Sequence, residues 1–351
     1  MRIAILVSGL PPHQLGGAEI AAAQIAKHAA LAGHDVHIIT PGIGTLDQIP
    51  VRKVRTWEKR YIRGLACVPG MVGAIRRIRP DIVHVQSLYM APGAIAARLL
   101  LGTPYLLYER GGVELPNPTN RITYPLAMRL ANRVVAQTEC QKRSLLQHHK
   151  REIEVIPNGV DLSLFNGISR ETARRTLGWP SDALIVLAVG RCRPEKNFRD
   201  FILAAECFHQ PHFLLIGAGD QLDKLREIGE EGNVEFLGDK NPKLIPTYMS
   251  GADILVNTSL SEGFPLTVLE GMAAGLPIVA PNVNGIPEIV TDGVNGILTQ
   301  PRSYVSTEAA IRKLLMSPEL RRCMGENNRI KAKEYTWDKV VEKLYGGAHE
   351  R

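Results

Sequence analysis

The chain alternates short apolar runs with longer stretches in which apolar positions recur at helical spacing. Runs rich in β-branched residues predict buried strands at 2–7, 36–40, 82–85, 105–108, 134–136 and 153–156. Helical stretches between them lie at 17–32, 70–79 and 139–149. Strands that alternate with helices indicate a parallel sheet with right-handed crossovers.

The second half of the chain repeats this pattern. Strands are expected at 184–189, 212–216, 234–237, 254–257 and 277–280, with helices at 197–208, 221–230, 244–250 and 266–274. Segment 157–161 and the polar stretch after it, as far as 170, predict a linker. We therefore expect an α/β chain of two doubly wound parallel-sheet domains, 1–165 and 166–335, facing each other across a cleft. Such sheets bind ligands at the carboxyl ends of their strands.

Composition narrows the class of protein. The 351 residues are 45% apolar and 22% charged, which is ordinary for a soluble globular protein. The apolar start of the chain runs into Pro11 and Pro12 without a cleavage site, and no apolar run approaches the ~18 residues of a spanning helix. Five scattered cysteines lack disulfide or zinc spacing, which favours the cytoplasm.

Charge is distributed unevenly along the chain. Residues 1–160 carry 20 Lys and Arg against 10 Asp and Glu, whereas residues 161–351 carry 22 against 25. The basic half indicates an anionic partner. Basic and apolar residues mix at 59–65 and 71–79, which fits either peripheral contact with an anionic membrane or ordinary helices covering a sheet, and both interpretations stay open. Nucleic acid is not expected, because this half lacks interleaved aromatic residues.

Two glutamates stand out in the segment that follows the expected strand 254–257. Glu262 lies in a loop, and Glu270 would lie inside a helix among apolar and small residues, where a carboxylate needs a partner such as a pair of ribose hydroxyls. Gly263 permits close approach of a ligand. The helix start would direct backbone amides at anions or hydroxyls, namely those of Gly263, Phe264 and Leu266. A solvated loop acid and a structural salt bridge are the alternatives.

Two further segments follow expected strands. Arg191 and Lys196 are five positions apart in a turn that opens a helix, so that a planar fork and a mobile ammonium could clamp a diphosphate. The alternative is a solvated basic turn. Gly16 and Gly17 would place backbone amides near a phosphate, although on their own they are better explained by a plain helix start.

Taken together, these stretches resemble the retaining glycosyltransferases of family 4, which have the GT-B fold. The resemblance covers essentially the whole chain. It rests on an ordered set of motifs: Gly16-Gly17-Ala18-Glu19, Asp81 to Val85, Val155 to Asp161, Gly190-Arg191 with Lys196, Gly217-Ala218-Gly219, Ser261-Glu262-Gly263-Phe264-Pro265-Leu266 to Glu270, and Asp292 to Gly296.

The resemblance implies a role for each of these residues. Glu262 and the amides after it would hold the donor sugar, and Glu270 would bind the ribose of a UDP- or GDP-type donor. Arg191 and Lys196 would neutralise the departing diphosphate beside Gly17, with no metal or other cofactor. The first domain would bind a glycan, lipid-linked or small-molecule acceptor, the second would bind the donor, and a helix within 336–351 would cross back onto the first domain.

The chain departs from the family pattern near the expected sugar. Arg110 stands where many members have His, and Gln86 where another His is common. A charged residue at a strand end favours a ligand contact for Arg110, whereas His13 and His84 are more simply structural. Two other interpretations stay open. One is a related enzyme on the same scaffold, a nucleotide-sugar epimerase or a phosphorylase, and the other is a relative that binds nucleotide sugars without turnover.

Overall fold

The computed structural model describes residues 1–11, 16–42, 44–55, 63–86, 88–110, 118–147, 150–210, 212–230 and 232–346. By contacts the chain divides into an N-terminal unit, Met1–Gly159 with Trp337–Arg351, and a C-terminal unit, Val160–Thr336. The two crossings lie side by side, because Val160 pairs with Thr336 and a Cβ on Gly159 would lie 2.6 Å from the Trp337 nitrogen. The first crossing thus falls six residues before the expected boundary at 165.

The N-terminal unit is built on a seven-stranded parallel sheet in the order β3-β2-β1-β4-β5-β6-β7. Its central strands are largely apolar and buried on both faces, as is typical of parallel sheets, and His84 in β4 is a buried polar exception. The strands are β1 (Arg2–Leu6), β2 (Asp35–Thr40), β3 (Val51–Lys53), β4 (Ile82–Val85), β5 (Tyr105–Tyr108), β6 (Arg133–Ala136) and β7 (Glu154–Val155).

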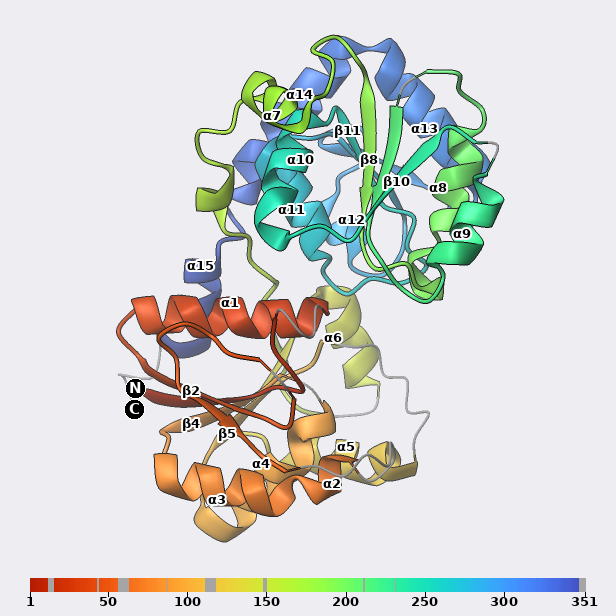
Figure 1. Ribbon diagram of the computed structural model, residues 1–351. Coiled ribbons are helices and arrows are strands. Elements are labelled where there is room, and N and C mark those ends of the chain that lie inside the picture. The colour runs from red at the N-terminus through yellow and green to blue at the C-terminus, as the bar shows by residue number, and fades with distance from the viewer. Residues whose placement is uncertain are drawn as a thin grey trace. The chain divides into compact units, whose positions relative to one another are not determined.

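Helices cover both faces of this sheet (Figure 1). One face carries α2 (Arg63–Ala66), α3 (Val68–Ile78), α4 (Ala91–Leu101) and α5 (Pro118–Leu130), with the short η1 (Leu88–Met90) before α4. The helix α6 (Glu139–Leu146) follows β6 and contributes Leu145 to the same core as α3, α4 and α5. On the other face α1 (Gly17–Leu31) packs against α15 (Trp337–Tyr345). The last helix of the chain therefore completes the N-terminal unit.

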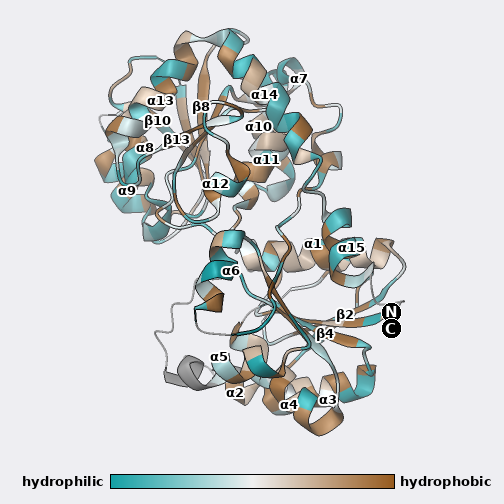
Figure 2. Ribbon diagram, turned by 180° about the vertical axis from the view of Figure 1, so that it is seen from behind, coloured by the Kyte–Doolittle hydropathy of each residue, from teal (hydrophilic) through white to brown (hydrophobic). Residues whose placement is uncertain are grey.

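The C-terminal unit has a six-stranded parallel sheet in the order β10-β9-β8-β11-β12-β13. Apolar strands again form the interior, and the helices turn polar residues outward (Figure 2). The strands are β8 (Ile185–Val189), β9 (His212–Ile216), β10 (Val234–Gly238), β11 (Ile254–Val256), β12 (Ile278–Pro281) and β13 (Gly296–Thr299).

The helices of this unit also form two layers. One layer holds α10 (Ile245–Gly251), α11 (Leu266–Ala274) and α12 (Ile286–Ile289), and the other holds α8 (Phe198–Ala205), α9 (Leu222–Ile228) and α13 (Tyr304–Met316). The remaining elements are η2 (Leu162–Phe165), α7 (Arg170–Leu177), η3 (Pro194–Lys196), η4 (Pro242–Leu244) and α14 (Pro318–Ala332). No helix in the described part of the chain is long and apolar enough to cross a membrane.

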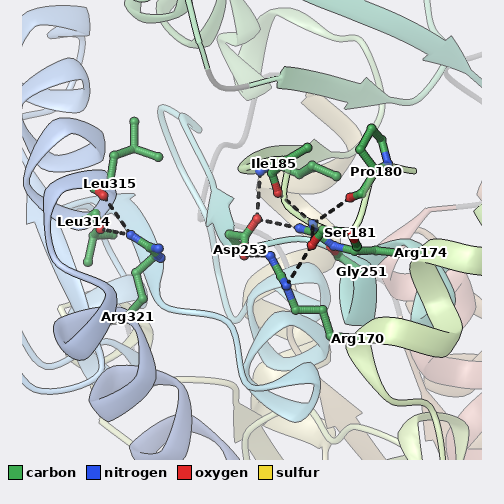
Figure 3. A network of polar contacts seen from close by, with 11 residues as sticks. Arg170, Arg174, Pro180, Ser181, Ile185, Gly251, Asp253, Leu314, Leu315 and Arg321 are labelled. Atoms are coloured by element: carbon green, nitrogen blue, oxygen red, sulfur yellow. Dashed lines mark hydrogen bonds and ion pairs between the residues drawn. The ribbon is translucent and has the colours of Figure 1, made fainter.

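A buried arginine ties α7 to the edge of the C-terminal core (Figure 3). Arg174 is 2% exposed and donates hydrogen bonds to four backbone carbonyls, those of Pro180, Ser181, Ala183 and Gly251. Its Nη2 lies 2.7 Å from Oδ2 of Asp253, which also accepts the backbone N–H of Ile185. The second carboxylate oxygen of Asp253 accepts from Arg170 at 2.9 Å. All hydrogen-bonding groups of the pair therefore have partners.

Candidate functional site

The carboxyl ends of β8 and β11, which are neighbours in the sheet, bring two predicted site residues into contact. Lys196 ends η3 after β8, and Glu262 lies in the loop between β11 and α11. Lys196 Nζ lies 2.5 Å from Glu262 Oε1 in a partly buried ion pair. The same oxygen accepts from Ser259 Oγ at 2.7 Å and from Asn257 Nδ2 at 3.4 Å. The Glu262 carboxylate thus holds the Lys196 ammonium in place. All three of these bonds are made by Oε1 of Glu262, and none by its Oε2.

Two hydrogen bonds to backbone carbonyls join the two loops that carry this pair. The Thr258 hydroxyl donates to the carbonyl of Lys196 at 2.9 Å, and the Leu260 N–H donates to the carbonyl of Glu195 at 2.8 Å. Asn197, directly after the lysine, adopts the left-handed conformation with φ of 47°. The turn and the loop therefore form one rigid support for Lys196 and Glu262.

A third loop, Gly217 to Gly219 after β9, lies against the turn that carries Arg191. Cys192 N–H donates to the carbonyl of Ala218, and a Cβ on Gly217 would lie 1.8 Å from the carbonyl oxygen of Gly190. Glycine is required here because no side chain fits between the two backbones. Arg191 is partly buried and makes no side-chain hydrogen bond or ion pair within the described residues. Its charge is therefore available to a ligand.

The helix α11 carries the second glutamate. Glu270 is partly buried, and its side chain makes no hydrogen bond or ion pair with another residue in the described part of the chain. Burial raises the pKa of its carboxyl to about 7. Gly271, beside it, packs so closely on β11 that a Cβ would lie 2.3 Å from the Leu255 side chain. The sequence predicted a carboxylate that needs a partner, and the structure leaves that carboxylate unpaired.

The start of α11 is less exposed than its predicted role suggests. The side chain of Phe264 lies in the core, with its ring centroid 5.3 Å from that of Tyr335, and Pro265 caps the helix without a side-chain hydrogen bond. Any contact from Phe264 to a ligand must therefore come from its backbone. The amides of the first helical turn, including that of Leu266, have no acceptor within the helix.

In the N-terminal unit a second cluster surrounds Arg110, at the carboxyl end of β5. Its Nε donates to Gln86 Oε1, and its Nη1 donates to Asn158 Oδ1 at 2.5 Å. The guanidinium carbon lies 4.1 Å from the centroid of the Tyr108 ring, within cation–π range. Nη2 is buried and has no hydrogen-bond partner among the residues that the structure describes. Burial lowers the pKa of Arg110, while Tyr108, Tyr345 and Glu19 act in the opposite direction.

His84 joins this cluster to the last helix. Its Nδ1 lies 2.5 Å from the Tyr345 hydroxyl, and its Nε2 lies 3.0 Å from Gln86 Nε2. The ring is fully buried, and burial, with Arg110 and Arg133, holds its pKa well below the usual range. A buried neutral imidazole with both nitrogens bonded is poorly suited to exchange protons with a substrate, and what the structure shows is a hydrogen-bonded link between Tyr345 and Gln86.

The remaining predicted residues fall into two groups. Gly16 is the N-cap of α1, and Gly17 opens that helix at an exposed position where an added Cβ would meet no atom within 4 Å. His13 and residues 59–62, by contrast, lie outside the described residues. Within the described ranges no group of three His, Cys, Asp or Glu side chains is placed to hold a metal ion, and all five cysteines are free thiols.

Comparison with known proteins agrees with this geometry. Residues 169–331 match the family described as glycosyl transferases group 1, and residues 15–164 match glycosyltransferase family 4. The D-inositol 3-phosphate glycosyltransferase of Mycobacterium leprae is 31% identical over 94% of this chain and 87% of its own length. The protein of that name from Geodermatophilus obscurus is 33% identical over 78% of this chain, which spans 63% of the relative's length.

Two solved structures have the same fold. Anabaena Alr3699/HepE in complex with UDP-glucose superposes with a TM-score of 0.86 at 22% identity and covers both chains fully. Sucrose-phosphate synthase from Thermosynechococcus elongatus gives 0.86 at 21% identity, over 99% of this chain and 98% of that one. The GT-B fold expected from the sequence is thereby confirmed, with two Rossmann-like units.

Proposed function

Because the chain belongs to the family 4, group 1 glycosyltransferases, we propose that it transfers a sugar from a nucleoside diphosphate sugar to an acceptor hydroxyl. The acceptor oxygen bonds to the anomeric carbon, and the bond from that carbon to the diphosphate breaks. The proton passes to the departing phosphate oxygen. The proposed stereochemical outcome is retention of configuration, without a covalent enzyme intermediate.

The contact between Lys196 and Glu262 is the observation that carries this proposal. The two residues lie 66 positions apart, and the sequence analysis assigned both of them to one site. Lys196 and Arg191 would stabilise the leaving diphosphate, so that the proposed reaction uses no metal or other cofactor. Glu262 and the amides at the start of α11 would hold hydroxyls of the donor sugar, and Glu270 would accept hydrogen bonds from the ribose. A charge placed before the reaction stabilises developing charge without reorganisation.

The C-terminal unit is the proposed donor domain, and the N-terminal unit is the proposed acceptor domain. UDP-glucose in HepE favours a UDP-type donor, with GDP as the alternative. The acceptor would be a glycan, a lipid-linked sugar or a small molecule. Curated relatives are named for D-inositol 3-phosphate, which favours an anionic acceptor, in agreement with the basic charge of residues 1–160. We expect a cytoplasmic protein that contacts the membrane at most peripherally.

A donor panel tests the proposal. UDP-, GDP- and other nucleoside diphosphate sugars should be screened by thermal shift, because a ligand that binds the native state raises its apparent stability. The strongest binder should then release free sugar and nucleoside diphosphate slowly in the absence of acceptor. Binding without turnover would indicate a non-catalytic relative, and no response to any donor would overturn the proposal.

Replacing Glu270 with alanine should weaken UDP binding about tenfold or more, because a hydrogen bond to a charged group is worth about 1.5–3 kcal/mol. The fold should survive, since the carboxylate supports no other described residue. Isothermal titration with UDP measures the effect. Glu227→Ala, at an exposed position on α9, is the matched control. Equal UDP affinity in the two variants would remove Glu270 from the donor site.

The pKa of Glu270 predicts a pH dependence of donor binding. The free carboxyl titrates near 7, and ribose hydroxyls that donate to its ionised form would lower that pKa in the complex. Affinity for UDP-glucose should therefore rise between pH 5 and 8, by a factor that approaches about tenfold if binding lowers the pKa by about one unit. Glu270→Gln should abolish this dependence. A pH dependence that persists in Glu270→Gln would assign it to another group.

A further inference from the structure

Arg110 is held rigidly by groups from three separate segments. Gln86 follows β4, Asn158 lies 48 positions later in the chain, and Tyr108 packs its ring under the guanidinium. Asn158 is itself 5% exposed, and the Tyr108 hydroxyl donates to the carbonyls of Ile156 and Pro157. An arginine side chain costs rotamer entropy when it is fixed in this way. A structure that fixes it without a ligand has prepared it for a partner of defined geometry.

The partners that hold Arg110 are neutral. Two amide oxygens and an aromatic ring contact its guanidinium, and no carboxylate in the described residues forms an ion pair with it. Glu19, which contributes negative charge nearby, accepts a hydrogen bond from Ser8 at 2.8 Å. Partly buried charges in proteins are normally paired. Within the described residues, the cationic charge has no ion-pair partner and the buried Nη2 has no hydrogen-bond partner.

The hydrogen-bond chain behind Arg110 has a direction. A guanidinium can only donate, so Gln86 must present Oε1 to Arg110 and Nε2 to His84. His84 Nε2 then accepts, and its proton lies on Nδ1 and is donated to Tyr345. The imidazole stays neutral in this arrangement. One positive charge, on Arg110, thus remains at the end of a buried chain that begins on α15.

We propose that Arg110 is the centre of an anion subsite that takes a carboxylate or phosphate group of the substrate. The proposal rests on the proposed function and names the substrate class of that site. The anion belongs either to the donor sugar, as the carboxylate of a uronic acid, or to a phosphorylated acceptor. Either group can accept from the free Nη2, and a planar fork suits both.

Binding measurements separate the two sources. For the donor, UDP-glucuronate is compared with UDP-glucose and UDP. For the acceptor, glucose 6-phosphate is compared with glucose in UDP-saturated protein. We expect one of the two anionic probes to bind wild-type protein about ten- to hundredfold more tightly than its neutral counterpart. Arg110→Gln should remove that preference and leave UDP affinity unchanged, while Arg110→Lys should keep part of it. Arg143→Gln, on the exposed side of α6, is the matched control.

The outcomes are distinct. If wild-type protein binds UDP but prefers neither anionic probe, the subsite is overturned and the proposed function stands. This outcome is decided by the wild-type measurements alone, without any variant. An anion preference that survives in Arg110→Gln would place the subsite elsewhere and overturn the assignment. Protein that binds no nucleotide at all would overturn the proposed function, and the subsite with it. If Arg110→Gln fails to fold, the wild-type comparison and Arg110→Lys still decide.

Discussion

Replacing Lys196 with alanine should lower the turnover number at saturating donor about a hundred- to a thousandfold, with a smaller rise in the donor Michaelis constant. The diphosphate gains negative charge as the glycosidic bond breaks, so a contact that strengthens with that charge lowers the barrier rather than only improving binding. Loss of one such stabilising group typically costs about 2.7–4 kcal/mol. Steady-state kinetics at varied donor concentration measure the split between the two constants.

The structure explains why the lysine should act efficiently. Its ammonium is already fixed by Glu262, whose carboxylate is in turn held by Ser259 and Asn257, so little reorganisation is needed on donor binding. Lys196→Arg should restore only part of the activity, because a planar fork does not reproduce a compact ammonium. Lys224→Ala, exposed on α9, is the control. Wild-type turnover with weaker donor binding in Lys196→Ala would exclude the leaving-group role.

Much of this fold can be predicted from sequence because parallel strands are buried on both faces. Each expected strand is present, with ends that differ by at most one residue. The sequence patterns missed shorter or less apolar elements. The edge strand β3 has the sequence Val-Arg-Lys, two-thirds polar, and β13 is four residues long beside a glycine-rich turn. The polar helix α14 has no adjacent strand that would mark its start, so no element is predicted within 281–335.

The candidate site, like the fold, could be predicted from the sequence only in part. Lys196 and Glu262 could be proposed because each follows an expected strand and matches a family motif, and the structure shows that the two strands are neighbours. The series of hydrogen bonds from Tyr345 through His84 and Gln86 to Arg110 could not be predicted. It depends on the packing of the last helix beside α1 and on the rotamers of these side chains. Its signal in the sequence was the pair of departures from the family pattern, Gln86 and Arg110. They prove to be hydrogen-bonded to each other.

The largest expected loss of stability follows from replacing Arg174 with methionine. The substitution removes every hydrogen bond that the guanidinium donates to the four carbonyls and to Asp253, and it leaves that nearly buried carboxylate with Arg170 as its remaining cation. Breaking a buried ion pair by removing one partner costs about 3–5 kcal/mol. For a unit of this size, about 2–4 °C of melting temperature is lost per kcal/mol.

Calorimetry should therefore show the transition of the C-terminal unit lowered by roughly 6–20 °C in Arg174→Met. Arg175→Met is a closely matched control, because the neighbouring side chain is exposed and makes none of the bonds described for Arg174. Arg174→Lys should recover little, since one ammonium with three donors cannot reach four carbonyls and a carboxylate from the positions of a planar fork. Similar melting temperatures for the two methionine variants would mean that the carbonyls of Pro180, Ser181 and Ala183 find water or other donors when Arg174 is removed, and that this network does not hold α7 on the core.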